Sequence, residues 1–326
     1  MEKVIALVVT YNRQLLLSAC ITALRNQTRK IDLIYVVNNG STDTTEDWLK
    51  QQQDLEFITQ KNVGGAGGFY TGIKTAYEKK FSWIWLMDDD GYPKEDALEK
   101  LLEDDTNELC LRNCAVINKE DKKSFVWKTG NNKTIDAVKD DKIWNVAHPF
   151  NGTLLHRKII ERVGFPNASL FLWGDESEYF YRIIKKNGIP SYTNTKSIHY
   201  HPPSAYSFKN DWAFESNWKM YYYVRNRLFV LKTRFSNSLI LAFAMYLLFI
   251  AAFAATIVLF QKSDKYKKLG FIVWPIADAF ASNCSATPAS VLKTLSATSR
   301  FNLRNYTLYR FRLVRSLFSS PAPSSL

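Results

Sequence analysis

The chain has 326 residues, enough for one large domain or for one domain with an appendage. Its formal net charge is +12, but residues 219–326 hold 15 Lys and Arg against two Asp, so residues 1–218 carry a net charge of −1. A solvated basic face is one interpretation of this tail. Because the cations alternate with apolar stretches, contact with an anionic membrane surface is favoured, and nucleic acid is not expected as a partner.

The start of the chain and its cysteines predict a cytoplasmic setting. Residues 4–9 are apolar but too few for a signal peptide, and they predict a buried strand. Cys20, Cys110, Cys114 and Cys284 form no CxxC pair and lack histidines at zinc-like spacing. We therefore expect four ordinary free thiols.

The first hundred residues alternate apolar strand runs with helical patterns, as the βαβ units of a mostly parallel sheet do. Strands are predicted over residues 4–10, 33–37, 55–59 and 81–87, and helices over residues 14–26, after residue 43 and up to about residue 77. Ligands of open α/β sheets sit beyond the carboxyl ends of strands. Three polar groups fall at such ends: Thr10-Tyr11-Asn12-Arg13, Asn38-Asn39-Gly40 and Asp88-Asp89-Asp90.

Further along the chain the pattern is weaker. Residues 110–143 alternate short apolar runs with Asn, Lys and Gly, which predicts edge strands or loops. A helix is expected from Trp173-Gly174-Asp175-Glu176 to about residue 188. A strand over residues 191–198 would then deliver His199 and His201.

The C-terminal region contains 23 consecutive residues without a charge, 238–260, which is long enough to span a membrane. Basic residues flank this segment on both sides and give no orientation. A single span, a segment lying in the cytoplasmic leaflet beside residues 269–281, and a buried core helix all remain open. The tail from Ser282 predicts a basic interfacial helix or a partly disordered segment. We place a boundary at residue 232, with an α/β domain before it and a membrane-associating helical region over residues 233–326.

Three consecutive aspartates follow an apolar strand, which places Asp88 and Asp90 on one side of an extended chain. Together they could share Mg²⁺ or Mn²⁺, hard cations that prefer oxygen ligands and leave positions open for phosphate. Such a cation would stabilise the charge that develops on a departing diphosphate. A solvated acidic turn is the simpler alternative.

The glycine-rich segment 62–68 is the second candidate, because glycines let backbone amides approach a diphosphate or a sugar. It matches neither the dinucleotide-binding fingerprint nor a P-loop. An ordinary flexible loop is equally compatible with this composition.

The segment Asp175-Glu176-Ser177-Glu178 offers an acid that could take a proton from an attacking hydroxyl, and we assign that role to Glu176. Favourable interaction with a helix dipole is the alternative for these charges. Trp173 could stack on a sugar ring or simply pack. His199 and His201 alternate along a strand, so both would face the same side, where a histidine could complete a metal site.

Taken together and in this order, these motifs resemble glycosyltransferase family 2, inverting enzymes of the GT-A fold, over residues 4–226. Within that family the chain looks most like the branch of galactofuranosyltransferases and bacterial rhamnosyltransferases. The motifs that carry the resemblance are Thr10-Tyr11-Asn12-Arg13, Val37-Asn38-Asn39-Gly40-Ser41-Thr42-Asp43, Asn62-Val63-Gly64-Gly65-Ala66-Gly67-Gly68-Phe69, Trp85-Leu86-Met87-Asp88-Asp89-Asp90 and Trp173-Gly174-Asp175-Glu176.

The resemblance implies a role for each group of residues. Asp88, Asp90 and His199 would bind the metal, and Glu176 or its neighbour Asp175 would be the catalytic base. The donor would be bound by Thr10, Asn12, Arg13, Asn38, Asn62, Gly64, Gly65, Gly67, Gly68, Phe69, Asp88 and Asp89. Trp173, Asn151 and His201 are expected to contact the acceptor.

Two residues depart from the family pattern. Many relatives carry Asp where this chain has Asn38, which keeps a carbonyl acceptor but loses the charge. Many also carry Asp-Asp in place of Asp175-Glu176, so the choice of base between these two stays open. The region after residue 279 does not follow the family pattern.

The expected activity is inverting, metal-dependent transfer of a hexose, galactofuranose from UDP-galactofuranose, to a lipid-linked acceptor of a cell-surface polysaccharide such as an O-antigen or a capsule. Transfer of rhamnose from dTDP-rhamnose is the nearest alternative. Nucleotidyl or phosphoryl transfer, and a membrane-anchored glycan-binding protein without catalysis, are the other classes considered. The expected location is the cytoplasmic face of the cell membrane, and a homo-oligomer stays open.

Overall fold

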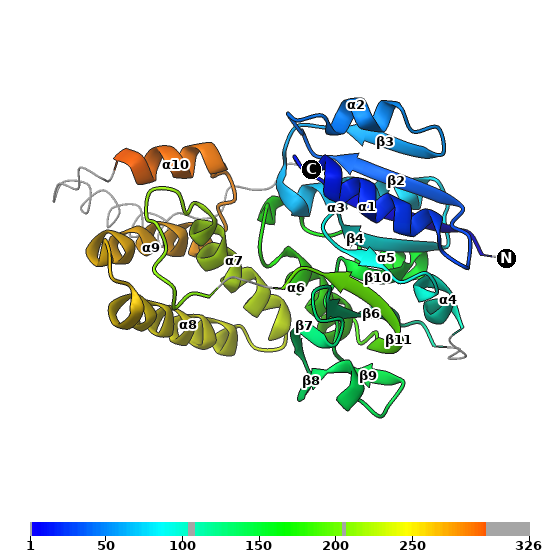
Figure 1. Cartoon of the computed structure of the whole chain (residues 1–326). Helices are drawn as coiled ribbons and strands as arrows, with labels where there is room; N and C mark the ends of the chain where they lie inside the picture. The colour runs from blue at the N-terminus through cyan, green and yellow to red at the C-terminus, as the bar shows by residue number, and fades with distance from the viewer. Residues whose placement is uncertain (1, 104–107, 204–206, 298–326) are drawn as a thin grey trace. The chain divides into compact units, whose positions relative to one another are not determined.

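The computed structural model describes residues 2–103, 108–203 and 207–297, and the chain divides into two packed units (Figure 1). Unit 1 comprises residues 1–168 and 179–205, and unit 2 comprises residues 169–178 and 206–326. The boundary expected at residue 232 falls inside a helix of unit 2, α7 (Lys219–Arg234). The reason is packing: α7 lies against the helices that follow it.

Unit 1 is built on one mixed sheet with the strand order β3-β2-β1-β4-β10-β6-β11-β5 (Figure 1). The main strands are β1 (Val4–Thr10), β2 (Leu33–Asn38), β3 (Leu55–Thr59), β4 (Trp83–Asp88), β5 (Tyr92–Pro93), β6 (Leu111–Asn118), β10 (Asn151–His156) and β11 (Ser191–His201). Three short strands flank them, β7 (Ser124–Thr129), β8 (Asn132–Thr134) and β9 (Lys142–Trp144). Strands β1 to β4 are mutually parallel, so the α/β class is confirmed.

Helices cover both faces of this sheet, because β1 is buried along its whole length and side chains alternate between the faces. Val4, Ala6 and Val8 pack with α1 (Gln14–Arg25), α2 (Thr45–Lys50) and α4 (Ala97–Leu102). Ile5, Leu7 and Val9 pack with α3 (Gly64–Glu78), α5 (Arg157–Val163) and the end of α6 (Asp175–Tyr181), which continues as a π-helical turn over Arg182–Lys186.

The strand register brings the predicted strand ends to one edge of the sheet. Thr10 lies beside Asn38 in the β1–β2 pair, and Val9 lies beside Asp88 in the β1–β4 pair. Because β1, β2 and β4 are parallel, the residues that follow them emerge at the same edge. That edge positions the candidate site.

The sequence interpretation was wrong about β6. Residues 111–118 were expected at an edge or in a loop, but β6 is buried between β10 and β11. Polar residues in this segment predicted exposure to solvent, but Arg112 and Asn113 are themselves buried. Arg112 Nη1 donates to the Leu101 carbonyl at 2.8 Å and Asn113 Nδ2 to the Tyr192 carbonyl at 3.1 Å.

The described part of unit 2 contains α7, α8 (Leu239–Phe260), α9 (Lys265–Phe280) and α10 (Pro288–Ala297). Ser238 begins α8, where its Oγ accepts a hydrogen bond from the Leu241 amide at 3.2 Å. Within the described ranges, α8 is the one helix long and apolar enough to cross a membrane. The tail expected from Ser282 includes α10, and residues 298–326 lie outside the described residues.

Candidate functional site

The polar side chains that follow β1 and β4 bond directly to one another. Thr10 Oγ1 donates to Asp89 Oδ2 at 2.7 Å. Arg13 Nη1 lies 3.1 Å from Asp89 Oδ1 and 2.8 Å from Asp90 Oδ2. The first and third polar groups predicted from the sequence therefore form one cluster at the edge of the sheet.

The pKa values of the two carboxyl groups of this cluster are shifted in opposite directions. Burial raises the pKa of Asp89, which is 3% exposed, and the bonds from Thr10 and Arg13 offset this only in part. Burial also acts to raise the pKa of Asp90, but the His201 ring and the Arg13 guanidinium outweigh it, and the net shift is downward. The surroundings of Asp90 thus favour its ionised form.

The histidines do not take the places expected from the sequence. His201 Nε2 lies 3.2 Å from Asp90 Oδ1, whereas His199 is fully buried, and burial lowers the pKa of His199 to about 3. A side chain at Gly91 would clash with the His199 ring, so the glycine leaves room for that ring. His201, which had been assigned to the acceptor, is therefore the histidine in contact with Asp90, and the metal-binding role expected of His199 stays a prediction.

The donor set at this edge suits a hard cation. Within the described ranges, no three His, Cys, Asp or Glu side chains converge as a ready-made metal centre. Asp90 and His201 do come together, and Asp88 is half-buried at the end of β4. Mg²⁺ commonly takes only one or two carboxylates from a protein and fills its shell with water and substrate phosphates. These residues therefore fit a cation that binds together with a diphosphate.

The residues after β1 and β2 brace each other's loops. Asn12 has a positive φ of 55°, its amide donates to Ser41 Oγ at 2.9 Å, and its Oδ1 accepts from the Thr42 amide at 2.6 Å. Asn38 is fully buried; its Oδ1 accepts from the Ser41 amide at 3.1 Å and its Nδ2 donates to Thr59 Oγ1 at 3.2 Å. The structure shows this bracing, and the nucleotide contacts expected of both residues stay predictions.

The glycine-rich segment begins a helix where the sequence interpretation placed a turn. Helix α3 starts at Gly64, which has a φ of 76°, and Asn62 Oδ1 accepts a hydrogen bond from the Gly64 amide at 2.9 Å. Gly67 faces Val63 so closely that a side chain there would clash, whereas Gly65 has open space. The Gly64 amide is thus taken up by Asn62, and Gly65 is the glycine of this segment with open space beside it.

The next two residues of α3 serve packing. A Cβ on Gly68 would come within 2.5 Å of Val9 Cγ1, so this glycine lets the helix approach β1 closely. Phe69 is 2% exposed and stacks on Phe150, with ring centroids 4.0 Å apart. Both residues had been assigned to the donor site. In the structure, the Phe69 side chain and the position that a Gly68 side chain would take face the core of unit 1.

The expected base belongs to unit 2. Asp175 and Glu176 start α6; Asp175 is 4% exposed and Glu176 is half-buried. Trp173 precedes them with a positive φ of 57°. Of the other expected acceptor residues, Asn151 begins β10 in unit 1 opposite Met87, and its Nδ2 donates to the Pro149 carbonyl at 3.3 Å. The proximity of Glu176 to the aspartates stays a prediction.

Two buried residues of α7 were not singled out from the sequence. Arg225 and Asn226 are fully buried, and both bond to backbone carbonyls of residues 169–173, just before the expected base. The available signal was a polar Arg-Asn pair inside a helix rich in aromatic and aliphatic residues. Such a pair is ordinarily expected to face solvent.

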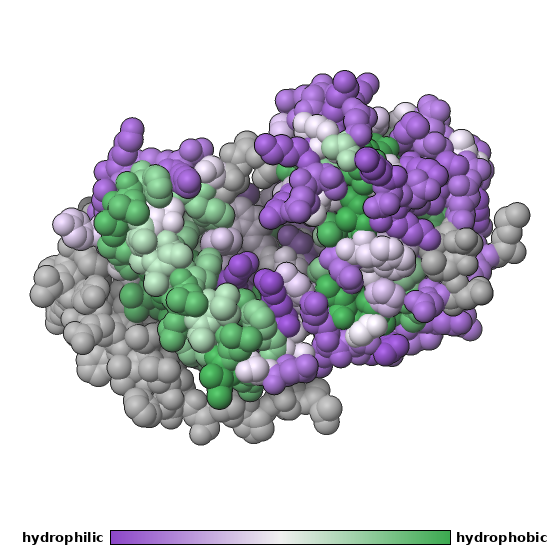
Figure 2. Space-filling model, turned by 90° about the horizontal axis from the view of Figure 1, so that it is seen from below, coloured by the Kyte–Doolittle hydropathy of each residue, from purple (hydrophilic) through white to green (hydrophobic). Residues whose placement is uncertain are grey.

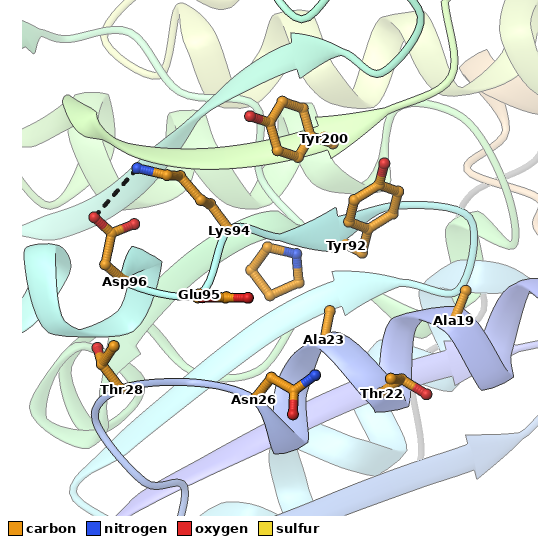
Figure 3. A pocket seen from close by; sticks show the side chains of 11 residues that line it. Ala19, Thr22, Ala23, Asn26, Thr28, Tyr92, Lys94, Glu95, Asp96 and Tyr200 are labelled. Atoms are coloured by element: carbon orange, nitrogen blue, oxygen red, sulfur yellow. Dashed lines mark hydrogen bonds and ion pairs between the residues drawn. The ribbon is translucent and has the colours of Figure 1, made fainter.

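A cavity of about 610 Å³ lies in unit 1 between α1 and the β5–β11 pair (Figure 3). Tyr92 and Tyr200 line it with rings 5.5 Å apart, and Lys94 pairs with Asp96 at 3.3 Å. None of the residues predicted for the site lines this cavity. The candidate site is therefore defined by the strand-end cluster.

Comparison with known proteins places this geometry in context. Residues 5–164 match the model of glycosyl transferase family 2. The chain is 31% identical to galactofuranosyltransferase GlfT1 of Mycolicibacterium smegmatis over 223 residues, which cover 64% of this chain and 74% of the relative. It is 30% identical to GlfT1 of Mycobacterium tuberculosis over 222 residues, 64% and 73% of the two chains.

A solved structure supports the architecture. The crystal structure of residues 1–349 of S. aureus TarS superposes with a TM-score of 0.54 at 12% identity, over 96% of this chain and 90% of that one. A likeness at this identity concerns the fold alone. The expected GT-A arrangement, a mostly parallel sheet flanked by helices, is confirmed.

Proposed function

The chain belongs to glycosyltransferase family 2, and from this premise we propose that it transfers galactofuranose from UDP-galactofuranose, with inversion, to a lipid-linked acceptor of a cell-surface polysaccharide. The observation that carries the proposal is the cluster of Thr10, Arg13, Asp89, Asp90 and His201 at the edge of the sheet. The choice of sugar rests on the two relatives that are named galactofuranosyltransferases.

Asp88, Asp90 and His201 would hold Mn²⁺ or Mg²⁺ in this proposal. The cation would neutralise negative charge on the departing diphosphate. Arg13 has a side chain that is 49% exposed and already contacts both Asp89 and Asp90, so its remaining donors can reach a phosphate oxygen. Asp89, held by Thr10, is assigned to the donor sugar or ribose.

Glu176 is proposed to act as the base. Its carboxylate takes the proton of the acceptor hydroxyl, whose oxygen attacks the anomeric carbon on the face opposite the diphosphate. The new glycosidic bond forms as the bond to the diphosphate oxygen breaks with its electron pair, so the anomeric configuration inverts. Asp175, more deeply buried at the start of the same helix, is the alternative base.

A donor screen tests the proposed substrate. The purified chain is incubated with UDP-galactofuranose, UDP-galactose or dTDP-rhamnose and a lipid-linked acceptor, with Mn²⁺ or with a chelator. We expect transfer from UDP-galactofuranose that the chelator abolishes. Transfer from dTDP-rhamnose alone would overturn the proposed donor sugar but not the assignment as a glycosyltransferase. Equal rates of transfer with Mn²⁺ and with the chelator would overturn the metal assignment.

We also propose that α8 lies in the plane of the membrane surface on the cytoplasmic side. One face of α8 packs into unit 2 through Ala242, Tyr246, Phe253 and Ile257. Its opposite face is apolar and exposed along the helix, and Figure 2 shows hydrophobic surface gathered over these C-terminal helices. The exposed residues are Leu239, Ile240, Leu241, Met245, Leu247, Leu248, Val258, Leu259 and Phe260.

The partner helix argues against a spanning orientation. Helix α7 packs along α8 and carries Arg225, Asn226 and Arg227, which a spanning α8 would carry into the hydrocarbon at a cost of several kcal/mol. An in-plane helix buries only its outer face, and Lys232, Arg234 and Lys262 beside its ends can meet anionic headgroups.

Flotation with vesicles of anionic and neutral phospholipids tests this surface. Replacing both Leu247 and Leu248 with Ser should release the protein from the vesicles, whereas Leu15→Ser, at an even more exposed leucine of unit 1, should not. Trypsin added outside should cleave near both Arg234 and Lys262, because both ends of an in-plane helix face one side. Protection of one end would establish a span, and unchanged flotation of the double variant would overturn the proposal.

A further inference from the structure

The six residues before α6 follow an unusual backbone path. Phe171 and Trp173 have positive φ values of 67° and 57°, and Gly174 has a φ of 102°. L-residues other than glycine rarely adopt such angles, and each costs on the order of 1–3 kcal/mol unless the surroundings enforce it. This loop leads directly into Asp175 and Glu176, so whatever holds the loop also sets where α6 begins.

The side chain of Asn226 in α7 holds this loop by its carbonyl groups. Asn226 Nδ2 lies 2.8 Å from the carbonyl oxygens of Leu170, Leu172 and Trp173. An Asn amide has two N–H groups, so three acceptors share two donors. The amide is fully buried, and each of these bonds replaces water that the site excludes.

Arg225 reinforces the same segment. Its Nη2 donates to the Leu170 carbonyl at 2.9 Å and to the Ser169 carbonyl at 3.3 Å, and its Nε donates to Asn226 Oδ1 at 2.9 Å. The guanidinium carbon lies 5.0 Å from the centre of the Tyr222 ring. Arg225 thus fixes the orientation of the Asn226 amide as well as the loop.

Packing leaves the loop little freedom around these bonds. The Phe171 ring stacks on the Tyr222 ring with centroids 5.0 Å apart. A Cβ on Gly174 would come within 3.3 Å of Asn226 Cβ and 3.2 Å of Val230 Cγ2, so the backbone of Gly174 lies directly against α7. All of these residues belong to unit 2, and they form one connection between α7 and the start of α6.

We infer that Asn226 is a positioning residue for catalysis: its three carbonyl contacts fix the path of residues 170–173 and thereby the orientation of Glu176. The inference rests on the proposed role of Glu176 as the base. Asn226 itself touches no reacting atom, so its removal should lower the rate of the chemical step and leave donor binding unchanged. A displacement of about 1 Å is enough to cost on the order of a hundredfold in rate.

Asn226→Leu keeps the branch at Cγ and the number of side-chain heavy atoms, and it removes both donors. The matched control is Leu228→Ala, a fully buried change in the same helix that removes packing against α8 and touches no carbonyl of the loop. We expect kcat of Asn226→Leu to fall about a hundredfold with the donor KM within about twofold of wild type. Leu228→Ala should lower the melting temperature and keep kcat per folded molecule. If Asn226→Leu does not fold, Asn226→Ser retains one donor and should show an intermediate kcat.

A double variant separates positioning from general destabilisation. If Asn226 acts through Glu176, adding Asn226→Leu to Glu176→Gln should lower kcat no further than Glu176→Gln alone. If the double variant loses kcat by the product of the two single losses, the inference is overturned. It is also overturned if Asn226→Leu keeps the wild-type kcat while Glu176→Gln is inactive. Full activity of Glu176→Gln would overturn the proposed base, and this inference with it.

A readout without substrate completes the test. Chymotrypsin cuts after aromatic residues such as Phe171 and Trp173, and mass spectrometry can locate the cuts. Release of the loop should make Asn226→Leu cleave there at least about tenfold faster than Leu228→Ala, because local opening governs proteolysis. Equal cleavage rates would show that Asn226 does not hold the loop.

Discussion

Polar side chains have different bonding partners in the two units. In unit 1, Arg13 contacts the carboxyl groups of Asp89 and Asp90, and the His201 ring contacts Asp90, so side chains bond to one another at the edge of the sheet. In unit 2, Asn226 and Gln261 donate to backbone carbonyls. Charged side chains that pair with each other can change partners when a charged ligand arrives, whereas side chains bonded to the backbone fix the course of the chain. Loss of the first kind should therefore cost activity, and loss of the second kind should cost stability or geometry.

The largest effect is expected at the strand-end cluster. Asp90→Ala should lower kcat by about 1,000-fold, because it removes the carboxyl group that contacts His201 and Arg13. The melting temperature should change little, since the residue serves the ligand more than the fold. Asp96→Ala, a carboxyl group six residues further on that pairs with Lys94, should keep its rate. Equal losses of kcat in Asp90→Ala and Asp96→Ala would contradict the assignment of the strand-end cluster to catalysis.

Two neighbouring lysines of α9 test how much a buried charge within unit 2 contributes to stability. Lys268 is fully buried, and its Nζ donates to Asp211 Oδ1 at 2.7 Å and to Gln261 Oε1 at 2.9 Å. Lys268→Met should lower the free energy of unfolding by about 3 kcal/mol without changing kcat per folded molecule. Lys267 forms a half-exposed ion pair with Asp264, and Lys267→Met should cost less than about 1 kcal/mol. Chemical denaturation measures both; equal costs would contradict the account.

Close helix packing in unit 1 should show in stability. A methyl group at Gly72 of α3 would clash with the Leu7 side chain, so Gly72→Ala should lower the free energy of unfolding by about 1–3 kcal/mol. Gly65→Ala lies in the same helix with open space around it and should be neutral or slightly stabilising. Denaturant titration of Gly72→Ala and Gly65→Ala measures the difference in free energy of unfolding that is due to the contact between α3 and β1.

The smallest expected effect is a dependence of stability on acid. The hydrogen bond from Lys268 lowers the pKa of Asp211 to about 2, below its value of about 3.9 in an unfolded chain. The unfolded state then binds the proton first, so this stabilisation is complete above about pH 4 and is lost as the pH falls toward 2. In Lys268→Met this acid dependence should be weaker, as unfolding curves at several pH values would reveal.

The strand ends could be predicted from the sequence because their signals are local. An apolar strand followed by Asp88, Asp89 and Asp90 is visible in a few residues, and parallel topology then brings the strand ends together. The pairing of Asp90 with His201 instead of His199 was missed. It depends on how β11 is seated against β5 and β6, which no local pattern encodes.

Other features required contacts distant in sequence. Five glycines within residues 64–72 argue against a helix by propensity, yet α3 forms because Gly68 and Gly72 let it lie against β1. The role of Asn226 was hidden for the same reason, since its partners lie more than 50 residues earlier in the chain. Helix propensity and hydrophobic period describe neighbours along the chain, so they do not report such contacts.

The central claim is that the carboxylates after β4 and the base on α6 carry out one transfer reaction. The most direct measurement is the rate of transfer from UDP-galactofuranose by wild-type protein and by Glu176→Gln, each with saturating donor and Mn²⁺. The account predicts that Glu176→Gln binds the donor as wild type does, melts at a similar temperature and transfers at least about 1,000-fold more slowly. Undiminished transfer by the folded variant would contradict it.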